Sequence, residues 1–161
     1  MISYIIIDGW KSNIRFSSAH IIHEYKKCGR LHGHTYAVHI KIVGEKDEKG
    51  IIIDFSILKE KLRKIIAELD HHVLIPSKSK IINITYEKEN VKISSLNKSY
   101  VLPKFDCVFL PIHSTSAENL SEYLLDRLLK EFELPNKIYS IEIGIDEGYG
   151  QGARVEKNFI K

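Results

Sequence analysis

The segment from His32 to Ile42 alternates between two kinds of side chain, and this alternation restricts how the chain can fold. The odd positions are mainly polar or small, whereas the even positions, apart from two histidines, are apolar or aromatic: His32, His34, Tyr36, Val38, Ile40 and Ile42. Successive side chains of a strand point to opposite faces. The pattern therefore predicts a half-buried strand whose buried face carries His32 and His34, with His39 pointing outward.

A second predicted strand, upstream, supplies a third histidine. Its even positions face the opposite way from Arg15, Ser17, Ala19 and His23, and they are Ile14, Phe16, Ser18, His20 and Ile22. Unless a bulge intervenes, this parity selects His20 over His23. A single His-x-His pair is more often an ordinary surface or core feature than a metal site. Three neutral imidazoles with a free fourth position are typical of catalytic zinc, so we expect His20, His32 and His34 to bind a metal.

The two cysteines of the chain differ in their surroundings. Cys107 lies in an apolar stretch and is predicted to be a buried strand residue, and no disulfide framework is expected from two cysteines. Cys28 is flanked by Lys26, Lys27 and Arg30, and neighbouring positive charge favours the reactive thiolate form. From the residues alone, Cys28 is a fourth metal ligand, a nucleophile, a proton-transfer base or an inert small side chain.

Two acidic residues carry weaker signals. Asp70 and His71 follow a predicted helix, and the pair matters only if the fold brings it to Cys28, where Asp70 would orient an imidazole that shuttles protons. Glu147 continues the alternation of Ile143 and Ile145, which places its carboxylate on an apolar face, where it needs a partner. The alternative is that the strand ends before Glu147 and leaves it in water.

Several stretches, taken together, resemble one protein family, the 6-pyruvoyltetrahydropterin and 6-carboxytetrahydropterin synthases. They occur in the family's order and span most of the chain: Phe16 to His20, Cys28 to His34, Ile53 to Phe55, Leu69 to His72, Ser116 to Leu120, and Asp146 with Glu147. The chain departs from the family at Thr115 and Ser116, where the family usually has Pro-Thr. A second departure is a longer segment over residues 73–114.

The resemblance implies a role for each candidate residue. Zinc would be bound by His20, His32 and His34, and protons would be transferred by Cys28, Asp70 and His71. Glu147 would anchor the pterin ring through a two-point contact with its 2-amino and N3 donors. Ser116 and Glu118 would lie at the same pterin site.

The spacing within the Cys28 motif favours one activity. Three residues separate Cys28 from His32, as in the 6-carboxytetrahydropterin synthases of the queuosine and archaeosine route, whereas the pyruvoyl-forming enzymes more often have five. The resemblance thus implies a carbon-carbon lyase that converts 7,8-dihydroneopterin triphosphate to 6-carboxy-5,6,7,8-tetrahydropterin, releasing acetaldehyde and triphosphate. Alternatives are a 6-pyruvoyltetrahydropterin synthase, an enzyme that releases the side chain to give a hydroxymethylpterin, and a non-enzymatic protein with a closed zinc site that includes Cys28.

Periodicity predicts an α+β fold. Helices begin at Asp54 and Ser116, each with an apolar stripe, and strands lie near residues 3–8, 13–22, 34–44, 138–147 and 153–160. This order predicts an antiparallel sheet with two helices packed on one face, in a single domain of residues 1–161. The segment of about residues 73–114 is expected to be an insertion with a hairpin near residues 80–102. The resemblance makes this the tunnelling fold (T-fold).

Charge and hydropathy bear on partners. The net charge of +3 is too small to indicate nucleic-acid binding, and no apolar run is long enough to cross a bilayer. The opening residues lack the basic flank of a signal peptide, so a cytoplasmic location is expected. The resemblance implies a small pterin triphosphate as substrate and a homohexamer, a dimer of trimers, with pockets between subunits.

Overall fold

One large mixed sheet organises the molecule. The computed structural model describes residues 1–135 and 137–159. Along the sheet the strands follow the order β10-β9-β3-β2-β4-β8, and β1 pairs with the second half of β3. The bounds of these strands are Ser3–Ile7 (β1), Arg15–His20 (β2), His32–Gly44 (β3), Val73–Pro76 (β4), Cys107–Leu110 (β8), Ile138–Glu147 (β9) and Gly152–Asn158 (β10).

The long strand β3 sets the two faces of the sheet. It pairs antiparallel with β2 on one side and β9 on the other, so that His32 lies opposite His20 and Tyr36 lies opposite Glu147. Four of the even positions predicted to be buried are buried, and they form the centre of the core: Tyr36, Val38, Ile40 and Ile42. His32 and His34, at the start of the strand, are half-buried. The alternation therefore identified the buried face of β3 correctly.

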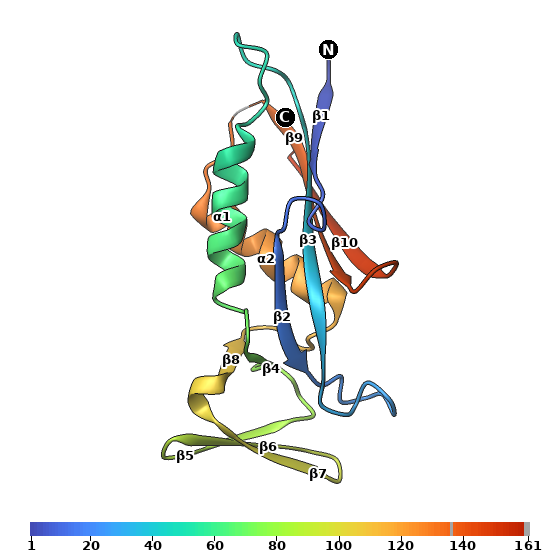
Figure 1. Ribbon diagram of the computed structural model, residues 1–161, viewed down its shortest axis with the longest axis vertical. Helices are drawn as coiled ribbons and strands as arrows, with labels where there is room; N and C mark the ends of the chain where they lie inside the picture. Colours follow the sequence, from blue (N-terminus) through green and yellow to red (C-terminus); the bar gives the residue numbers. More distant parts are fainter. Residues whose placement is uncertain (136, 160–161) are drawn as a thin grey trace.

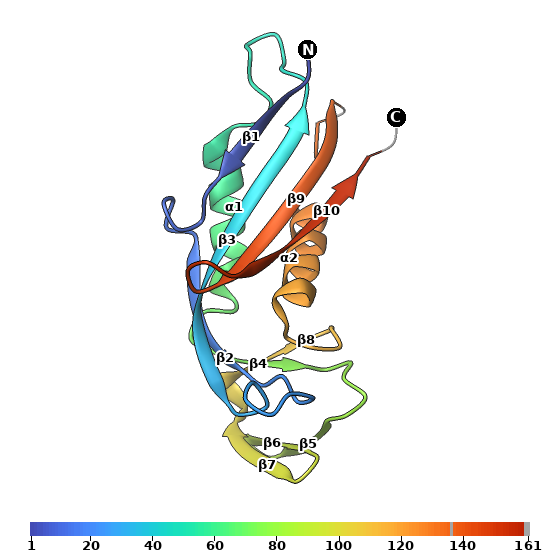
Figure 2. The ribbon, with the colours of Figure 1, turned by 90° about the vertical axis from the view of Figure 1, so that its right-hand side faces the viewer.

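Two helices cover that face, as Figures 1 and 2 show. Helix α1 spans Phe55–Ala67, and Asp54 caps it because its carboxylate accepts a hydrogen bond from the Ser56 N–H at 2.7 Å. Helix α2 spans Ala117–Glu131, with Ser116 as its N-cap. Both predicted starts are confirmed. Apolar stripes of the two helices meet the sheet and bury Leu58, Leu62, Ile65, Leu120, Leu124 and Leu128.

The predicted antiparallel sheet holds for its main part but changes at one edge. Strands β4 and β8 join there in parallel, β4 beside β2 and β8 beside β4. Each has only four residues, which is too short for a periodic pattern to reveal it. The pairing of Val73 with both Ala19 and Cys107 anchors this edge.

The remaining strands, which lie between β4 and β8 in the sequence, form a small separate sheet. It has three antiparallel strands in place of the predicted hairpin: β5 (Asn83–Glu87), β6 (Asn90–Ser95) and β7 (Lys98–Pro103). A short 3₁₀ helix, η1 (Lys104–Asp106), leads from it into β8. The small sheet has its own apolar cluster of Ile75, Ile82, Val91, Ile93 and Cys107, and it lies at the far end of the molecule from the chain termini (Figure 1).

Neither of the two α-helices among the described residues is long and apolar enough to cross a membrane.

Candidate functional site

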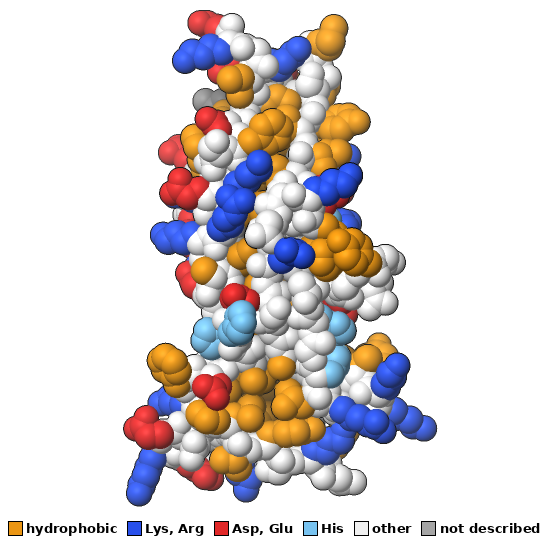
Figure 3. Space-filling view, viewed as in Figure 1, with side chains coloured by type: hydrophobic (Ala, Val, Ile, Leu, Met, Phe, Trp, Pro, Cys, Tyr) orange, Lys and Arg blue, Asp and Glu red, His pale blue; other side chains and the backbone are white. Residues whose placement is uncertain are grey.

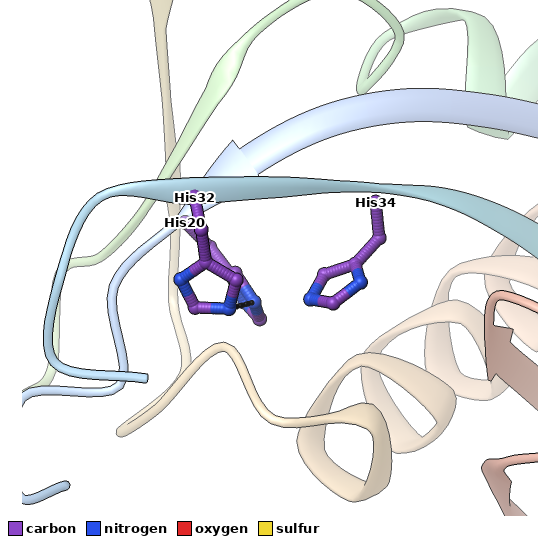
Figure 4. Close-up of side chains that lie close together, drawn as sticks. All are labelled: His20, His32 and His34. Atoms are coloured by element: carbon purple, nitrogen blue, oxygen red, sulfur yellow. Dashed lines mark hydrogen bonds between the residues drawn. The ribbon is translucent and has the colours of Figure 1, made fainter. Parts of the chain in front are cut away.

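Three histidine rings meet on the helix-covered side of the sheet. His20 is the last residue of β2, while His32 and His34 lie at the start of β3. One ring nitrogen from each lies within 4.8 Å of the other two, and Nε2 of His20 is 3.1 Å from Nε2 of His32. Figure 4 shows the rings hanging from the two strands toward the segment that leads into α2. The strand parity that selected His20 thus corresponds to a cluster in space.

Backbone carbonyls fix the orientation of two of these rings. Nδ1 of His20 lies 2.9 Å from the carbonyl oxygen of Thr115, and Nδ1 of His32 lies 2.7 Å from that of Arg30. A carbonyl oxygen only accepts hydrogen bonds, so both Nδ1 atoms donate and both Nε2 atoms keep free lone pairs. Two such lone pairs 3.1 Å apart repel each other unless a cation or proton lies between them. The donor set therefore fits a metal ion.

Burial favours the neutral form of two of these imidazoles. His20 is 1% exposed, and burial lowers its pKa to about 4, assisted by the nearby charges of His32 and His34 and opposed by the hydrogen bond to Thr115. Burial, together with His32, also lowers the pKa of His34. Neutral imidazole is the form that coordinates metal, so the three residues could hold a divalent ion near pH 7.

Glu147 lies beside this cluster, and its side chain is on the apolar face of β9, as the continued alternation predicted. It is the last residue of β9, so the strand does not end before it, and it faces the same side as Tyr36 and His34. Its Oε1 is 4.0 Å from Nε2 of His20 and has no hydrogen-bond partner among the described residues. Burial, and to a smaller extent the charge of Glu118, raises the pKa of Glu147, although His32 opposes this. A buried carboxylate oxygen without a partner is costly, which points to a ligand that donates hydrogen bonds.

A small pocket of about 210 Å³ opens next to Glu147. It brings together the predicted residues Glu147, Ser116 and Glu118, and it adds Gln151 and Gly152 from the turn between β9 and β10. Sequence reasoning treated that turn only as the end of the strand. Its glycines at positive φ, Gly148 and Gly150, were the available signal that the chain folds back over the site.

Cys28 lies in the loop between β2 and β3 and is exposed. Its backbone carbonyl accepts a hydrogen bond from the Ile22 N–H at 2.9 Å, while its thiol makes no hydrogen bond with any described residue. The predicted exposed thiol is therefore present. Cys107 is buried in β8, as predicted.

Asp70 and His71 form an ion pair, but on the other side of the sheet. Asp70 Oδ2 is 2.9 Å from Nδ1 of His71, and its Oδ1 accepts a hydrogen bond from the Ser17 N–H at 2.7 Å. Partial burial raises the pKa of Asp70, but the Ser17 hydrogen bond and His71 outweigh it and lower the pKa overall. His71 lines a hollow with Ser17 and Thr35, whose side chains alternate with those facing the histidine cluster. A single chain thus forms the pair and the cluster without joining them.

On the face seen in Figure 3, histidine side chains appear at two places, on either side of the narrow lower part of the molecule.

A further polar group supports the end of β9 from the face opposite Glu147. The buried Asp146 accepts hydrogen bonds from Trp10 Nε1 at 2.9 Å and Arg154 at 2.7 Å, and it pairs with His39 at 2.9 Å. His39 does point away from the cluster, as predicted, yet it is largely buried. Sequence reasoning missed this group, because its members come from four separate segments.

Comparisons with known proteins agree with this arrangement. The sequence profile described as 6-pyruvoyl tetrahydropterin synthase matches residues 10–158. A Methanocaldococcus jannaschii protein, provisionally named a 6-carboxy-5,6,7,8-tetrahydropterin synthase, is 36% identical over 155 residues, 94% of each chain. The Haemophilus influenzae 6-carboxy-5,6,7,8-tetrahydropterin synthase is 30% identical over 124 residues, which cover 74% of this chain and 80% of that protein.

Solved structures show the same fold over nearly the whole chain. The 6-pyruvoyl tetrahydropterin synthase of Plasmodium vivax superposes with a TM-score of 0.91 at 34% identity and covers 99% of both chains. The Plasmodium falciparum enzyme of that name gives a TM-score of 0.90 at 33% identity, covering 98% of this chain and 99% of the other.

Proposed function

The chain belongs to the 6-pyruvoyl tetrahydropterin synthase family, and within that family we propose that it is a zinc-dependent 6-carboxytetrahydropterin synthase. In this proposal, 7,8-dihydroneopterin triphosphate and water give 6-carboxy-5,6,7,8-tetrahydropterin, acetaldehyde and triphosphate. The reaction would make a precursor on the queuosine and archaeosine route. Formally the enzyme is a carbon-carbon lyase.

One observation carries the proposal: three imidazoles converge on one point next to a buried carboxylate oxygen that has no partner among the described residues. His20, His32 and His34 would hold the zinc, which supplies Lewis-acid stabilisation of the negative charge that develops on a substrate oxygen. The carbonyls of Thr115 and Arg30 hold two of these rings in the tautomer that leaves Nε2 free. No protein donor satisfies Oε1 of Glu147 among the described residues, so its partner would come from the substrate.

Glu147 would anchor the pterin ring. Its carboxylate would accept hydrogen bonds from the 2-amino group and N3, a two-point contact that fixes the position and the orientation of the ring. Those donors would also stabilise the carboxylate, which burial disfavours. Ser116 and Glu118 line the same pocket and would contact the ring edge.

The remaining predicted residues would move protons. Cys28 as thiolate would take a proton from a side-chain carbon, and His71, held by Asp70 at 2.9 Å, would return a proton to carbon or oxygen. The side chain then breaks between two carbons, and a carboxylate remains on the ring.

These roles require more than one chain. The Asp70–His71 pair lies on the face opposite the histidine cluster, so one subunit would present its pair to a neighbour's cluster. Strands β1 and β10 lie at the edges of the sheet, where each has an unpaired side among the described strands. Open edges favour pairing with another chain. We propose a homohexamer, a dimer of trimers, with the sites between subunits.

Product analysis tests the reaction. Purified zinc-loaded protein is incubated with 7,8-dihydroneopterin triphosphate, and acetaldehyde and pterin products are measured. Stoichiometric acetaldehyde with 6-carboxytetrahydropterin supports the proposal. Consumption of the substrate without acetaldehyde would contradict it and would favour the second candidate, a 6-pyruvoyltetrahydropterin synthase, which is the name of the Plasmodium proteins that share the fold.

Cys28→Ala separates catalysis from a structural zinc site. If Cys28 acts as a proton-transfer base, the variant keeps its fold and its zinc but loses about 10³-fold in activity. A loss of this size is typical when a general acid or base is removed. Loss of zinc and of thermal stability in this variant would instead indicate a closed structural site that includes the thiol.

A further inference from the structure

The loop that carries Cys28 is held together mainly by its own backbone. The Ile22 N–H donates to the Cys28 carbonyl at 2.9 Å, and the Gly29 N–H donates to the Tyr25 carbonyl at 2.7 Å. Gly29 is buried, and a Cβ atom there would lie 2.1 Å from the Tyr25 carbonyl oxygen. The turn therefore closes so tightly that only glycine fits.

Lys98 connects this turn to a distant part of the chain. The ammonium group of Lys98 donates to the carbonyl oxygen of Gly29 at 2.5 Å. Among the hydrogen bonds of the described residues, it is the one that ties residues 23–29 to a segment outside the loop. Burial lowers the pKa of His23. The nearby charge of Lys98 adds to this lowering, and Glu24 opposes it.

The small sheet holds the backbone of Lys98 in place. It is the first residue of β7 and pairs with Ser95 across the turn from β6. The strands beneath it share the apolar cluster that includes Val91 and Ile93, and this cluster joins the main sheet through Ile75 and Cys107. Figures 1 and 2 both show the loop lying over the small sheet. The small sheet can thus hold the loop at a fixed distance from the main sheet.

Hydrogen bonds hold the peptide groups on both sides of Cys28. The Ile22 N–H donates to the carbonyl of Cys28, and the Arg30 N–H donates to the carbonyl of Lys27 at 3.2 Å. That N–H belongs to the same peptide group as the Gly29 carbonyl, which Lys98 holds. With the peptide groups before and after Cys28 held, the direction in which its side chain leaves the backbone is set. A shift of about 1 Å in a catalytic group can cost as much as 10²-fold in rate.

Building on the proposed function, we propose that Lys98 is a positioning residue for Cys28. By holding the Gly29 carbonyl, it keeps the thiol aimed at the substrate, and the small sheet formed by β5, β6 and β7 serves as the support of the catalytic loop. Lys98 acts through the loop and has no contact with substrate in this proposal.

The test compares Lys98→Ala, Lys98→Arg and a control, Lys92→Ala. Lys92 is exposed on the neighbouring strand β6, and its side chain makes no hydrogen bond or ion pair within the described part of the chain, so its loss removes a charge from the same sheet without touching the loop. For each full-length, zinc-loaded variant, kcat and KM are measured with 7,8-dihydroneopterin triphosphate. Trypsin cleavage after Lys26, Lys27 and Arg30 is followed by mass spectrometry as a readout of the loop that does not depend on activity.

The expected result is a split between the kinetic constants. Lys98→Ala should lower kcat about tenfold, leave KM within about twofold, and speed cleavage of the loop about tenfold, as loss of one charge-assisted hydrogen bond predicts. Lys98→Arg should restore both values to near wild type, since a guanidinium can also donate to the carbonyl, and Lys92→Ala should change neither.

Three results would overturn the proposal. Unchanged cleavage and kcat in Lys98→Ala would show that the contact does not hold the loop, and faster cleavage with unchanged kcat would show that it does not position Cys28. A raised KM at constant kcat would point instead to substrate contact. Wild-type protein that produces no acetaldehyde would refute the proposed function, and trypsin cleavage would then decide by itself whether Lys98 holds the loop.

Discussion

Histidines on the two sides of the β2–β3 strand pair lie in opposite environments. On the face covered by the helices, His20 is 1% exposed and hydrogen-bonded to a backbone carbonyl, whereas on the other face His71 is 83% exposed and paired with Asp70. Burial favours neutral imidazole, the form that binds a metal, and exposure beside a carboxylate suits a ring that takes up and releases protons. The comparison shows how the two sides of one sheet can present residues suited to two different tasks.

The largest expected effect comes from removing one ring of the buried face. His34→Ala should reduce bound zinc to a small fraction of one ion per chain and lower activity by at least about 10³-fold, because two ligands cannot hold the ion against competition from water. Zinc is measured by elemental analysis of the purified protein. His113→Ala is the control, since His113 is an exposed histidine that hydrogen-bonds only to Lys78 among the described residues. Full zinc content in His34→Ala would remove His34 from the ligand set.

The exposed face should respond differently. His71→Ala should lower activity about 10²-fold while zinc content and thermal stability stay near wild type, because the exposed ring pairs with Asp70 and lies on the face opposite the zinc ligands. Loss of zinc in this variant would contradict the separation of the two faces.

Mixing variants tests whether the two faces meet between chains. His34→Ala and His71→Ala protein are unfolded together, refolded with zinc and assayed. If sites are shared, mixed assemblies contain some sites with an intact cluster from one chain and an intact pair from another, and part of the activity returns. Each variant refolded alone is the control. A mixture no more active than its components would argue that each chain completes its own site.

The sequence predicted the buried face better than the exposed one, for physical reasons. Strand alternation is a local property, so the parity of His20, His32 and His34 could be read without knowing the fold. The place of Asp70 and His71 depends on the parallel pairing of β4 with β2, and β4 is too short to show a pattern. The alternation within β2 and β3 could not show that Asp70 and His71, from a distant segment, lie against their other face.

The contacts that orient the site were also out of reach of sequence reasoning. The Thr115 carbonyl contacts His20, which lies 95 residues away in the sequence. Every residue has a backbone carbonyl, so the residue type at position 115 gives no sign of this contact. The same holds for the Gly29 carbonyl and Lys98. The capping residues Asp54 and Ser116, by contrast, act within their own helix turn and were predicted correctly.

The stability that the buried face provides should also depend on pH. The pKa of His20 is about 4 in the folded chain and near 6.5 in the unfolded chain, so the unfolded state binds more protons between these values. Its contribution to stability is therefore fully present above about pH 6.5 and is lost as the pH falls toward 4, by on the order of 3 kcal/mol. Urea unfolding of zinc-depleted protein at several pH values measures this. His20→Asn should flatten the curve, and an equally steep curve in that variant would contradict the assignment.

The smallest expected effect concerns Glu147. Burial disfavours its charged carboxylate, whereas hydrogen bonds from a bound pterin would favour it. Burial raises the pKa of Glu147, so its contribution to stability is present below its unfolded pKa and is lost as the pH rises through its folded pKa. Glu147→Gln keeps the shape but removes the charge. At pH 7 and without ligand, the variant should therefore be at least as stable as wild type. Its dissociation constant for a pterin should rise about tenfold, because the amide NH₂ group is a donor and cannot accept a hydrogen bond from the pterin donors.

Calorimetric titration with a pterin and thermal unfolding of the same samples measure both quantities. Glu118→Gln is the matched control, since Glu118 lines the same pocket but lies outside the core of buried residues. Its substitution should weaken pterin binding less than Glu147→Gln. Unchanged pterin affinity in Glu147→Gln would remove the anchoring role, and lower stability without ligand would show that a partner within the protein already satisfies the carboxylate.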